Sequence, residues 1–306
     1  MKVIYANSKT KLSKTAIAIG IFDGVHRGHQ YLLKAMLKKA QQLKAKPVVI
    51  TFFPHPAHVL RPDLKLGYLV SLEHRFQLLA RLGVDACIVI IFTKKFAAIE
   101  PAAFIREVLV KRLGAKAIFV GEDFHFGRDR MGDIKLFQSM AHECGYEMHP
   151  IKAIHQGGQP ISSTRLRNLI TDGNITQPQK LLGRPFSIMG KVVKGDGRGK
   201  SLGFPTANVA YKNDILPPNG VYAVRVMGKY GILNGVANLG VRPSFKDKNP
   251  KVHLEVFIFD FKKDLYGQIL EVEFIKKIRS EEKFNNVQDL IHQIQKDAHQ
   301  ARQILK

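Results

Sequence analysis

The sequence predicts an α/β protein with two domains: a parallel sheet covered on both faces by helices, and then a module of antiparallel strands that ends in a long helix. Three observations lead to this prediction. The length of 306 residues is natural for two domains. The first half alternates short apolar runs with amphipathic helical segments. Most of the second half consists of strand-like segments separated by Gly- and Pro-rich turns.

Alternating strand-like and helix-like segments predict a parallel sheet in the first half, because a helix can cross from one parallel strand to the next. Helical spacing is clearest for Leu33, Met36 and Leu37 in the segment Gly28–Leu43. The predicted strands are Ala16–Phe22, Pro47–Phe53, Ala86–Phe92, Ala117–Val120 and Met148–Ile154. The predicted helices are Gly28–Leu43, Ser71–Leu82, Pro101–Leu113, Asp133–Cys144 and Thr164–Ile170.

Alternation and β-branched residues in the second half predict an antiparallel barrel or sandwich. One apolar face along Val287–Leu305 predicts the final helix, with Asn285 or Asn286 as its N-cap. The predicted strands are Ser187–Lys194, Gly220–Met227, Gly231–Asn238, His253–Asp260 and Gln268–Ile278.

The boundary between the halves is predicted from a change in composition. Thr171–Pro178 is polar and contains Gly173 and Asn174, which is typical of a loop or linker. We therefore expect one domain at residues 1–175, a linker at residues 176–182 and a second domain at residues 183–306.

Composition limits the class of protein. Hydrophobic residues make up 45% of the chain, so each half can bury a core, but no apolar run approaches the roughly 20 residues that span a bilayer. The N-terminus does not resemble a secretory signal, and the two cysteines, Cys87 and Cys144, suggest no disulfide framework. These features predict a cytoplasmic protein without a membrane partner, and they leave its oligomeric state open.

The formal net charge of +23 predicts attraction to polyanions. One interpretation is nucleic-acid binding, and the other is a basic background combined with sites for anionic nucleotides. Lys and Arg are spread along the whole chain, and no basic block is interleaved with aromatic residues as in single-strand binders. This distribution favours the second interpretation, so we expect small-molecule partners and no specific nucleic acid.

A turn rich in glycine and histidine follows the first main strand. In GIFDGVHRGHQ (Gly20–Gln30), Gly24 and Gly28 permit close approach of the backbone to phosphate, and the following helix N-terminus favours an anion. His26 and His29 can donate hydrogen bonds to phosphate oxygens during phosphoryl or nucleotidyl transfer. The His-x-Gly-His pattern in this context resembles the nucleotidyltransferase superfamily, in which the motif holds ATP for attack at its α-phosphate.

Three other segments can complete this site. ISSTRLR (Ile161–Arg167) places hydroxyl groups and fixed charge at a helix start, although Ser and Thr are also ordinary helix caps. TFFPHP (Thr51–Pro56) and GEDFHFG (Gly121–Gly127) follow predicted strands. In GEDFHFG, the acidic Asp123 stands beside Phe124 and Phe126, and such a combination can contact a flat ring system. Each of these two loops, taken alone, favours a structural role, either as a loop with a hydrogen-bonded His or as one with a core Phe.

A second phosphate-binding candidate lies in the other half. GDGRGKSLGFPTAN (Gly195–Asn208) is glycine-rich and basic, so its backbone amides can surround phosphates, although a flexible hairpin would have the same composition. Thr206 and Asn208 offer oxygens to a hard cation such as Mg²⁺. Glu255 lies in the otherwise apolar strand HLEVFIFDF, either as a structural ion-pair partner or as a general base.

The motifs together resemble the prokaryotic bifunctional riboflavin kinase/FMN adenylyltransferase family, also called FAD synthetases. The resemblance covers nearly the whole chain and includes the segments above together with LLGRPF, GVYAV, the RPSF turn, DLYG and IRSEEKF. It implies a Rossmann-like N-terminal nucleotidyltransferase domain and a C-terminal β-barrel riboflavin kinase domain. The kinase would convert riboflavin and ATP to FMN, and the adenylyltransferase would convert FMN and a second ATP to FAD and pyrophosphate.

The resemblance also implies roles for particular residues. Glu255, His26 and His29 would be catalytic, and Thr206 and Asn208 would bind Mg²⁺. The implied flavin-binding residues are His55, Asp123, Phe124, Phe126 and Arg279. The implied ATP- and phosphate-binding residues are Gly20, Phe22, Asp23, Gly24, Gly28, Ser162, Ser163, Thr164, Arg167, Gly195, Gly197, Arg198, Gly199, Lys200 and Pro205.

Two positions depart from the family pattern. His125 occupies a position where the family usually has Arg, and Ser244 occupies a position where Thr is common. Neither change removes an implied catalytic residue. The alternatives to a bifunctional enzyme are an enzyme that has kept one activity, and a basic nucleic-acid-binding protein on a nucleotidyltransferase fold.

Overall fold

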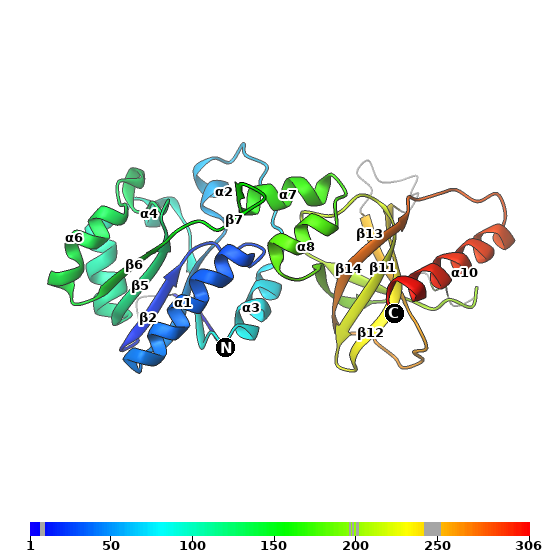
Figure 1. Cartoon of the computed structure of the whole chain (residues 1–306), viewed down its shortest axis with the longest axis horizontal. Helices are drawn as coiled ribbons and strands as arrows, with labels where there is room; N and C mark the ends of the chain where they lie inside the picture. Colours follow the sequence, from blue (N-terminus) through cyan, green and yellow to red (C-terminus); the bar gives the residue numbers. More distant parts are fainter. Residues whose placement is uncertain (7–9, 196, 198, 200–201, 242–251) are drawn as a thin grey trace. The chain divides into compact units, whose positions relative to one another are not determined.

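The computed structural model describes residues 1–6, 10–195, 197, 199, 202–241 and 252–306 (Figure 1). The chain divides into two compact units. The N-terminal unit comprises Met1–Leu66 and Leu72–Ser162, and the C-terminal unit comprises Gly67–Ser71 and Ser163–Lys306.

A six-stranded parallel sheet forms the centre of the N-terminal unit, as predicted, with the strand order β1-β4-β3-β2-β5-β6. The edge strand β1 was not predicted, because it is only four residues long and only partly buried. The strands are β1 (Lys2–Tyr5), β2 (Thr15–Ile19), β3 (Lys46–Phe53), β4 (Ala86–Ile91), β5 (Ala115–Gly121) and β6 (Glu147–Ile151).

Helices bury the apolar side chains of this sheet. Ile17, Ile50 and Val120 pack in one core cluster with Phe104 of η1 and Phe137 of α6. Helix α1 follows β2 in the chain, and it contacts β2, β3 and β5. The helices are α1 (Arg27–Leu43), α2 (Pro56–Leu60), α3 (Leu72–Arg81), α4 (Lys94–Ala97), α5 (Pro101–Ala103), the π-helical η1 (Phe104–Arg112), the short η2 (Arg128–Arg130) and α6 (Ile134–Cys144). The short strands β7 (His155–Gln156) and β8 (Gln159–Pro160) pair with each other.

The C-terminal unit begins with two helices, α7 (Ser163–Thr171) and α8 (Thr176–Leu182). The prediction of a loop over Thr171–Pro178 is therefore wrong in its second half. Pro178 lies in the first turn of α8, where its missing N–H is tolerated. The helix also buries Leu181 and Leu182, which stabilises it against the local preference for a loop.

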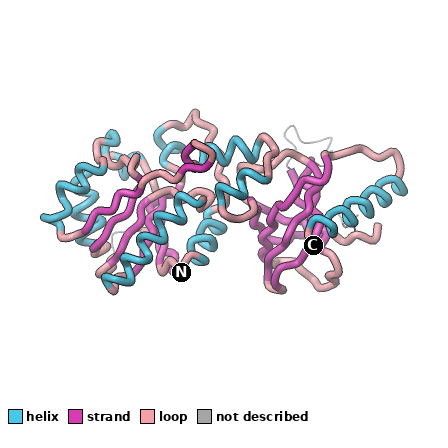
Figure 2. The backbone as a smooth tube through the Cα atoms, viewed as in Figure 1, coloured by secondary structure: helices cyan, strands magenta, loops and turns pink. Residues whose placement is uncertain are grey.

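A closed antiparallel barrel follows, with the strand order β10-β13-β12-β11-β14-β9 (Figure 2). Because the sheet closes on itself, the second half forms the barrel and not the sandwich, which was the other predicted architecture. Strand β10 was predicted as part of a glycine-rich loop, because its first residues are short and polar. The strands are β9 (Phe186–Val193), β10 (Thr206–Tyr211), β11 (Gly220–Gly228), β12 (Gly231–Val241), β13 (Val252–Ile258) and β14 (Ile269–Arg279).

The final helix, α10 (Val287–Ile304), packs on the barrel as predicted. Ala298 and Ala301 lie in one buried cluster with Val221 and Phe259. Asn286 is its N-cap, since the side-chain oxygen accepts a hydrogen bond of 2.8 Å from the Asp289 amide. Within the described part of the chain, the helices are too short or too polar to cross a membrane.

A segment that we call the strap, Gly67–Ser71, belongs to the C-terminal unit although its sequence neighbours belong to the N-terminal unit. Arg167 Nε donates a hydrogen bond of 2.7 Å to the carbonyl of Gly67. Asn213 Nδ2 donates one of 2.8 Å to the carbonyl of Leu69. Side chains from two distant parts of the C-terminal unit therefore bind the backbone of the strap.

The N-cap of α10 makes a testable contribution to stability. We expect Asn286→Ala to destabilise the C-terminal unit by about 1 kcal/mol, because the first turn of α10 loses its side-chain acceptor. Asn286→Ser should lower the stability of this unit much less, since a serine hydroxyl group can also cap a helix. Thermal unfolding followed by circular dichroism compares the two variants. Equal melting temperatures for Asn286→Ala and the wild type would contradict this role.

Candidate active sites

The turn between β2 and α1, Gly20–His26, lies at the carboxyl end of the central strands, and we call it the phosphate turn. Phe22, Gly24 and Val25 have φ values of 54°, 79° and 43°. Glycine adopts this left-handed region freely, but Phe and Val do so at a cost in free energy. Phe22 is almost completely buried, so packing holds the turn in this conformation.

His26 is the N-cap of α1, and its Nδ1 accepts a hydrogen bond of 3.3 Å from the backbone amide of His29. Because Nδ1 acts as an acceptor, the proton of a neutral His26 is carried by Nε2. The two imidazole rings stack with their centroids 3.6 Å apart. The predicted His-x-Gly-His pair thus forms one rigid unit at a helix N-terminus.

The pKa of His29 lies well below its usual value, mainly because the ring is buried and also because of the nearby His26 and Arg75. The Phe22 ring contacts the His29 ring edge-on, at a centroid distance of 5.2 Å. Among the described residues, His29 Nδ1 has no hydrogen-bond partner. At neutral pH, His29 is therefore a neutral imidazole that can offer a hydrogen bond but no full positive charge.

Gly28 and Asp23, which were also predicted to bind phosphate, have different surroundings. A Cβ atom on Gly28 would lie 3.1 Å from His26 Nδ1 and 3.8 Å from the carbonyl oxygen of Ile161, so the start of ISSTRLR lies against the turn. Asp23 is 1% exposed, and its Oδ1 lies 3.9 Å from Arg75 Nη2. The structure therefore places Asp23 beneath the turn, in contact with a buried cation.

The remaining residues of ISSTRLR open α7. Ser162 is the last residue of the N-terminal unit, and Ser163 and Thr164 begin the helix. Arg167 is 9% exposed, with its Nε bound to the strap.

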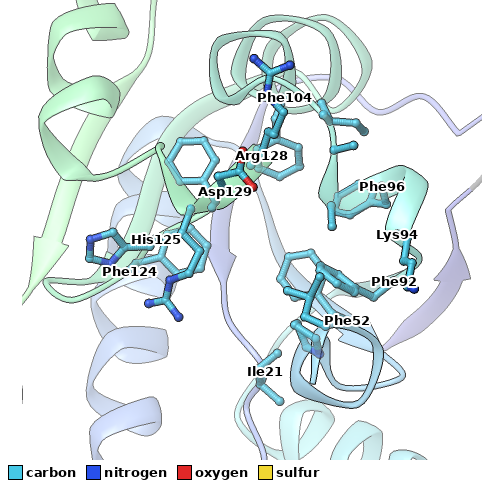
Figure 3. Close-up of a pocket in the computed structure, with 18 of the residues that line it drawn as sticks. Ile21, Phe52, Phe92, Lys94, Phe96, Phe104, Phe124, His125, Arg128 and Asp129 are labelled. Atoms are coloured by element: carbon cyan, nitrogen blue, oxygen red, sulfur yellow. The ribbon is translucent and has the colours of Figure 1, made fainter. Parts of the chain in front are cut away.

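A large aromatic pocket, with a volume of about 870 Å³, begins at Gly20 and Ile21 of the same turn (Figure 3). Its apolar lining consists largely of phenylalanine side chains: Phe52, Phe92, Phe96, Phe104, Phe124 and Phe126. A flat ring system can be buried against such a lining. Sequence reasoning identified Phe124 and Phe126 but missed the other four, which come from three separate segments.

The predicted polar residues of this pocket come from two loops. His55 lines the pocket and caps α2, since its Nδ1 accepts a hydrogen bond of 3.0 Å from the Ala57 amide. Asp123 is exposed in the loop after β5 and also lines the pocket. His125 turns back on this loop, with Nδ1 2.9 Å from the carbonyl oxygen of Asp123.

The C-terminal unit holds a second pocket of about 300 Å³ between the barrel and α10. A polar row crosses its barrel side: Glu255 pairs directly with Asn208 of β10 and with Asn238 of β12. Glu255, Asn238 and Thr206 line the pocket, together with the apolar Val221. The site thus combines a half-buried carboxylate with amide and hydroxyl groups and an apolar wall.

Glycines of the predicted phosphate loop lie against these polar side chains. A Cβ atom on Gly195 would lie 2.2 Å from Asn208 Nδ2, and one on Gly199 would lie 3.1 Å from Thr206 Oγ1. Gly197 has a φ of 73°, which favours glycine. Pro205 is exposed next to Thr206. The predicted residues Arg198 and Lys200, and the RPSF turn with Ser244, lie outside the described residues.

Arg279, predicted to bind flavin, lines the pocket and forms a bidentate ion pair with Asp297 of α10. The shortest contact joins Nη2 to Oδ2 at 2.8 Å, and Asp297 is 3% exposed. Sequence reasoning missed Asp297. The signal was present, because Asp297 is a charged residue on the apolar helix face that includes Ile294 and Ala301.

Comparison with known proteins identifies the family. Residues 8–165 match the family model of FAD synthetase, and residues 182–305 match that of riboflavin kinase. A bifunctional riboflavin kinase/FMN adenylyltransferase from Escherichia coli K12 is 39% identical over 94% of this chain and 91% of the relative. This chain belongs to that family. It is a riboflavin kinase and an FMN adenylyltransferase, and it makes FMN and FAD.

Two further proteins are similar to nearly the whole length of this riboflavin kinase/FMN adenylyltransferase. The enzyme of the same name from Bacillus subtilis is 36% identical over 96% of this chain and 93% of the relative. A crystal structure described as the macrolide-efflux protein from Streptococcus pneumoniae has a TM-score of 0.85 and 31% identity, and the match covers 99% of each chain. The predicted fold class is confirmed.

The lowered pKa of His29 predicts an acid-sensitive stability. Unfolded His29 has a pKa near 6.5, so below about pH 6.5 the unfolded chain binds a proton that the native ring does not. Stability should therefore fall with decreasing pH, by up to about 1.4 kcal/mol per pH unit from this residue. Urea unfolding at pH 7.5 and pH 5.5 measures the loss, which should be smaller in His29→Gln. An identical loss in both proteins would show that His29 titrates normally.

Proposed function

We propose that the barrel pocket phosphorylates riboflavin and that the phosphate turn, with its aromatic pocket, adenylylates FMN. We assign the two reactions to different units because each pocket is lined by residues of one unit. The FAD synthetase match covers the phosphate turn, and the riboflavin kinase match covers the barrel pocket. The proposed domains are residues 1–175 and 183–306, with the connection at residues 176–182.

In the kinase site, Glu255 acts as the general base. Its carboxylate takes the proton of the ribityl 5′-hydroxyl as that oxygen attacks the γ-phosphorus of ATP, and ADP leaves as FMN forms. The position of Glu255 between Asn208 and Asn238 supports this role, because the strand register fixes its backbone at the pocket. Arg279 and the apolar wall bind the flavin ring, with Arg279 held in place by Asp297.

Mg²⁺ fits the oxygen donors of the barrel site. Thr206 offers a hydroxyl and Asn208 an amide oxygen, which suit a small hard cation that also binds substrate phosphates and water. Any side chain at Gly195 would overlap the Asn208 amide, so glycine there keeps this donor accessible. When bound, the cation offsets phosphate charge. Gly195, Gly197, Gly199 and Pro205 bring backbone close to the phosphates.

In the adenylyltransferase site, an oxygen of the FMN phosphate attacks the α-phosphorus of a second ATP, and pyrophosphate leaves. His26 and His29 donate hydrogen bonds to the phosphates beside the N-terminus of α1. Gly20 and Gly24 of the turn and Gly28 of the first turn of α1 let the backbone approach ATP closely. Further ATP contacts come from the backbone of Phe22 and Asp23, whose side chains are buried, and from Ser162 of the N-terminal unit.

The aromatic pocket binds the flavin ring of FMN, with His55 and Asp123 as its polar contacts and Phe124 and Phe126 as its apolar ones. The size of the pocket and its aromatic lining support this assignment. The barrel acts first in this scheme, because its product is the substrate of the other site. The partners are small molecules, and the two free cysteines support a cytoplasmic location.

The kinase assignment predicts a selective loss. Glu255→Gln should lower kcat for FMN formation by about 10²- to 10⁴-fold, because the amide cannot accept the hydroxyl proton. Conversion of added FMN and ATP to FAD should stay within about twofold of wild type, which is the matched control. Both reactions can be followed by chromatography of the flavins. A folded variant with wild-type FMN formation would exclude Glu255 as the base.

The adenylyltransferase assignment predicts the opposite pattern. His29→Ala should lower kcat for FAD formation by about 10²- to 10³-fold, because a hydrogen bond to the reacting phosphates is lost. Starting from riboflavin, the reaction should then accumulate FMN. Unchanged FAD output from this variant would refute the role given to His29.

A further inference from the structure

We propose that Arg75 is a positioning residue for adenylyl transfer, whose buried guanidinium group fixes the phosphate turn through Asp23 and Thr51. This inference rests on the assignment of adenylyl transfer to that turn. Arg75 lies on α3, outside every motif that identified the site. It contacts the turn from within the N-terminal unit and has no predicted contact with ATP or FMN.

Arg75 carries a charged side chain into the interior of the N-terminal unit. Its side chain is 0% exposed, and it is the largest of the fully buried side chains in the described chain. Removing a guanidinium group from water costs several kcal/mol unless charged and polar partners replace the water. Arginine is rarely found in such a position without a partner. The contacts of Arg75 therefore indicate why the chain keeps a charge there.

Two of these contacts reach the phosphate turn. Arg75 Nη2 lies 3.9 Å from Asp23 Oδ1, and Asp23 is itself buried. Arg75 Nη1 donates a hydrogen bond of 3.3 Å to Thr51 Oγ1, and Thr51 in turn donates one of 2.9 Å to the carbonyl oxygen of Ile21. One guanidinium group thus forms a long ion pair with Asp23 and, through Thr51, is linked by hydrogen bonds to Ile21.

These two anchor points lie on either side of Phe22, the first left-handed residue of the turn. A non-glycine residue keeps such a φ value only where its surroundings hold it. Ile21 and Asp23 are held by one rigid, planar group, which fixes the direction of the chain as it leaves β2. The turn then presents Gly24 and the imidazole of His26 at the start of α1.

The charge of Arg75 adds an electrostatic effect behind the turn. The cation is close enough to contribute to the low pKa of His29, after the larger effects of burial and His26. Its field is also favourable for an anion at the helix N-terminus. The same residue therefore supports both the shape of the turn and the potential at the phosphate site.

The test compares Arg75→Met with Arg75→Lys and Thr51→Val in the full-length protein. Arg75→Met should lower kcat for FAD formation from FMN by about 10- to 100-fold, with smaller changes in KM, because the reacting groups are misaligned. Arg75→Lys should recover part of this loss by restoring the charge. Thr51→Val removes the hydroxyl that accepts from Arg75 and donates to Ile21, leaves the Arg75–Asp23 contact in place, and should lower kcat by about 3- to 10-fold. FMN formation from riboflavin is the internal control and should not change.

A wild-type kcat in folded Arg75→Met would overturn the inference, as would equal losses in Arg75→Met and Arg75→Lys. If Arg75→Met does not fold, Thr51→Val decides: a lowered kcat with normal FMN formation supports the inference, and an unchanged kcat overturns it. His29→Ala separates this result from the parent proposal. Normal FAD formation in His29→Ala would refute the site assignment itself, whereas its loss alongside an active Arg75→Met would refute only the role of Arg75.

Discussion

In the barrel, Asn208, Glu255 and Asn238 occupy one row because the antiparallel register of β10, β13 and β12 pairs them directly. A shift of one residue would turn Glu255 to the other face of the barrel wall. The parallel sheet uses register in a different way. Strands β2, β3 and β5 end at one edge, so that the phosphate turn, Thr51 and the loop after β5 are neighbours. Both sites therefore depend on strand pairing before any side chain interacts.

Each unit also places a buried or partly buried Arg–Asp pair next to its site, and the two pairs differ in geometry. Arg279 and Asp297 form a close bidentate pair between β14 and α10. Arg75 and Asp23 are 3.9 Å apart, and Arg75 also bonds to Thr51. Buried pairs contribute little net stability, because desolvation opposes their attraction. Within the proposed function their value is positional, since each pair holds a segment to which substrate-binding groups are assigned.

Much of the fold and the local motifs could be predicted from the sequence. Periodicity predicted the sheet, most of the barrel strands and α10, because those segments are long and bury one regular face. Strand β1 and helix α8 were missed, since their stability comes from tertiary packing that the local pattern does not contain. The motifs predicted phosphate binding by the turn after β2 and by the Gly195–Asn208 segment, and both assignments stay predictions. The motifs could not predict Arg75, because it lies outside them and reaches the turn only after folding, whereas Asp297 was marked in the sequence only as a charged residue on the apolar face of α10. The neutral state of His29 likewise depends on burial.

The strap has a consequence for how separable the two activities are. The chain passes between the units at residue 66, returns at residue 71 and passes again at residue 162. No single cut yields two intact halves. A fragment that ends before α7 keeps the strap but loses Arg167 and Asn213, which bind its carbonyl groups. The complementary fragment keeps these side chains without the backbone that they bind. Splitting this gene into two independent enzymes would require rebuilding that contact in at least one of them.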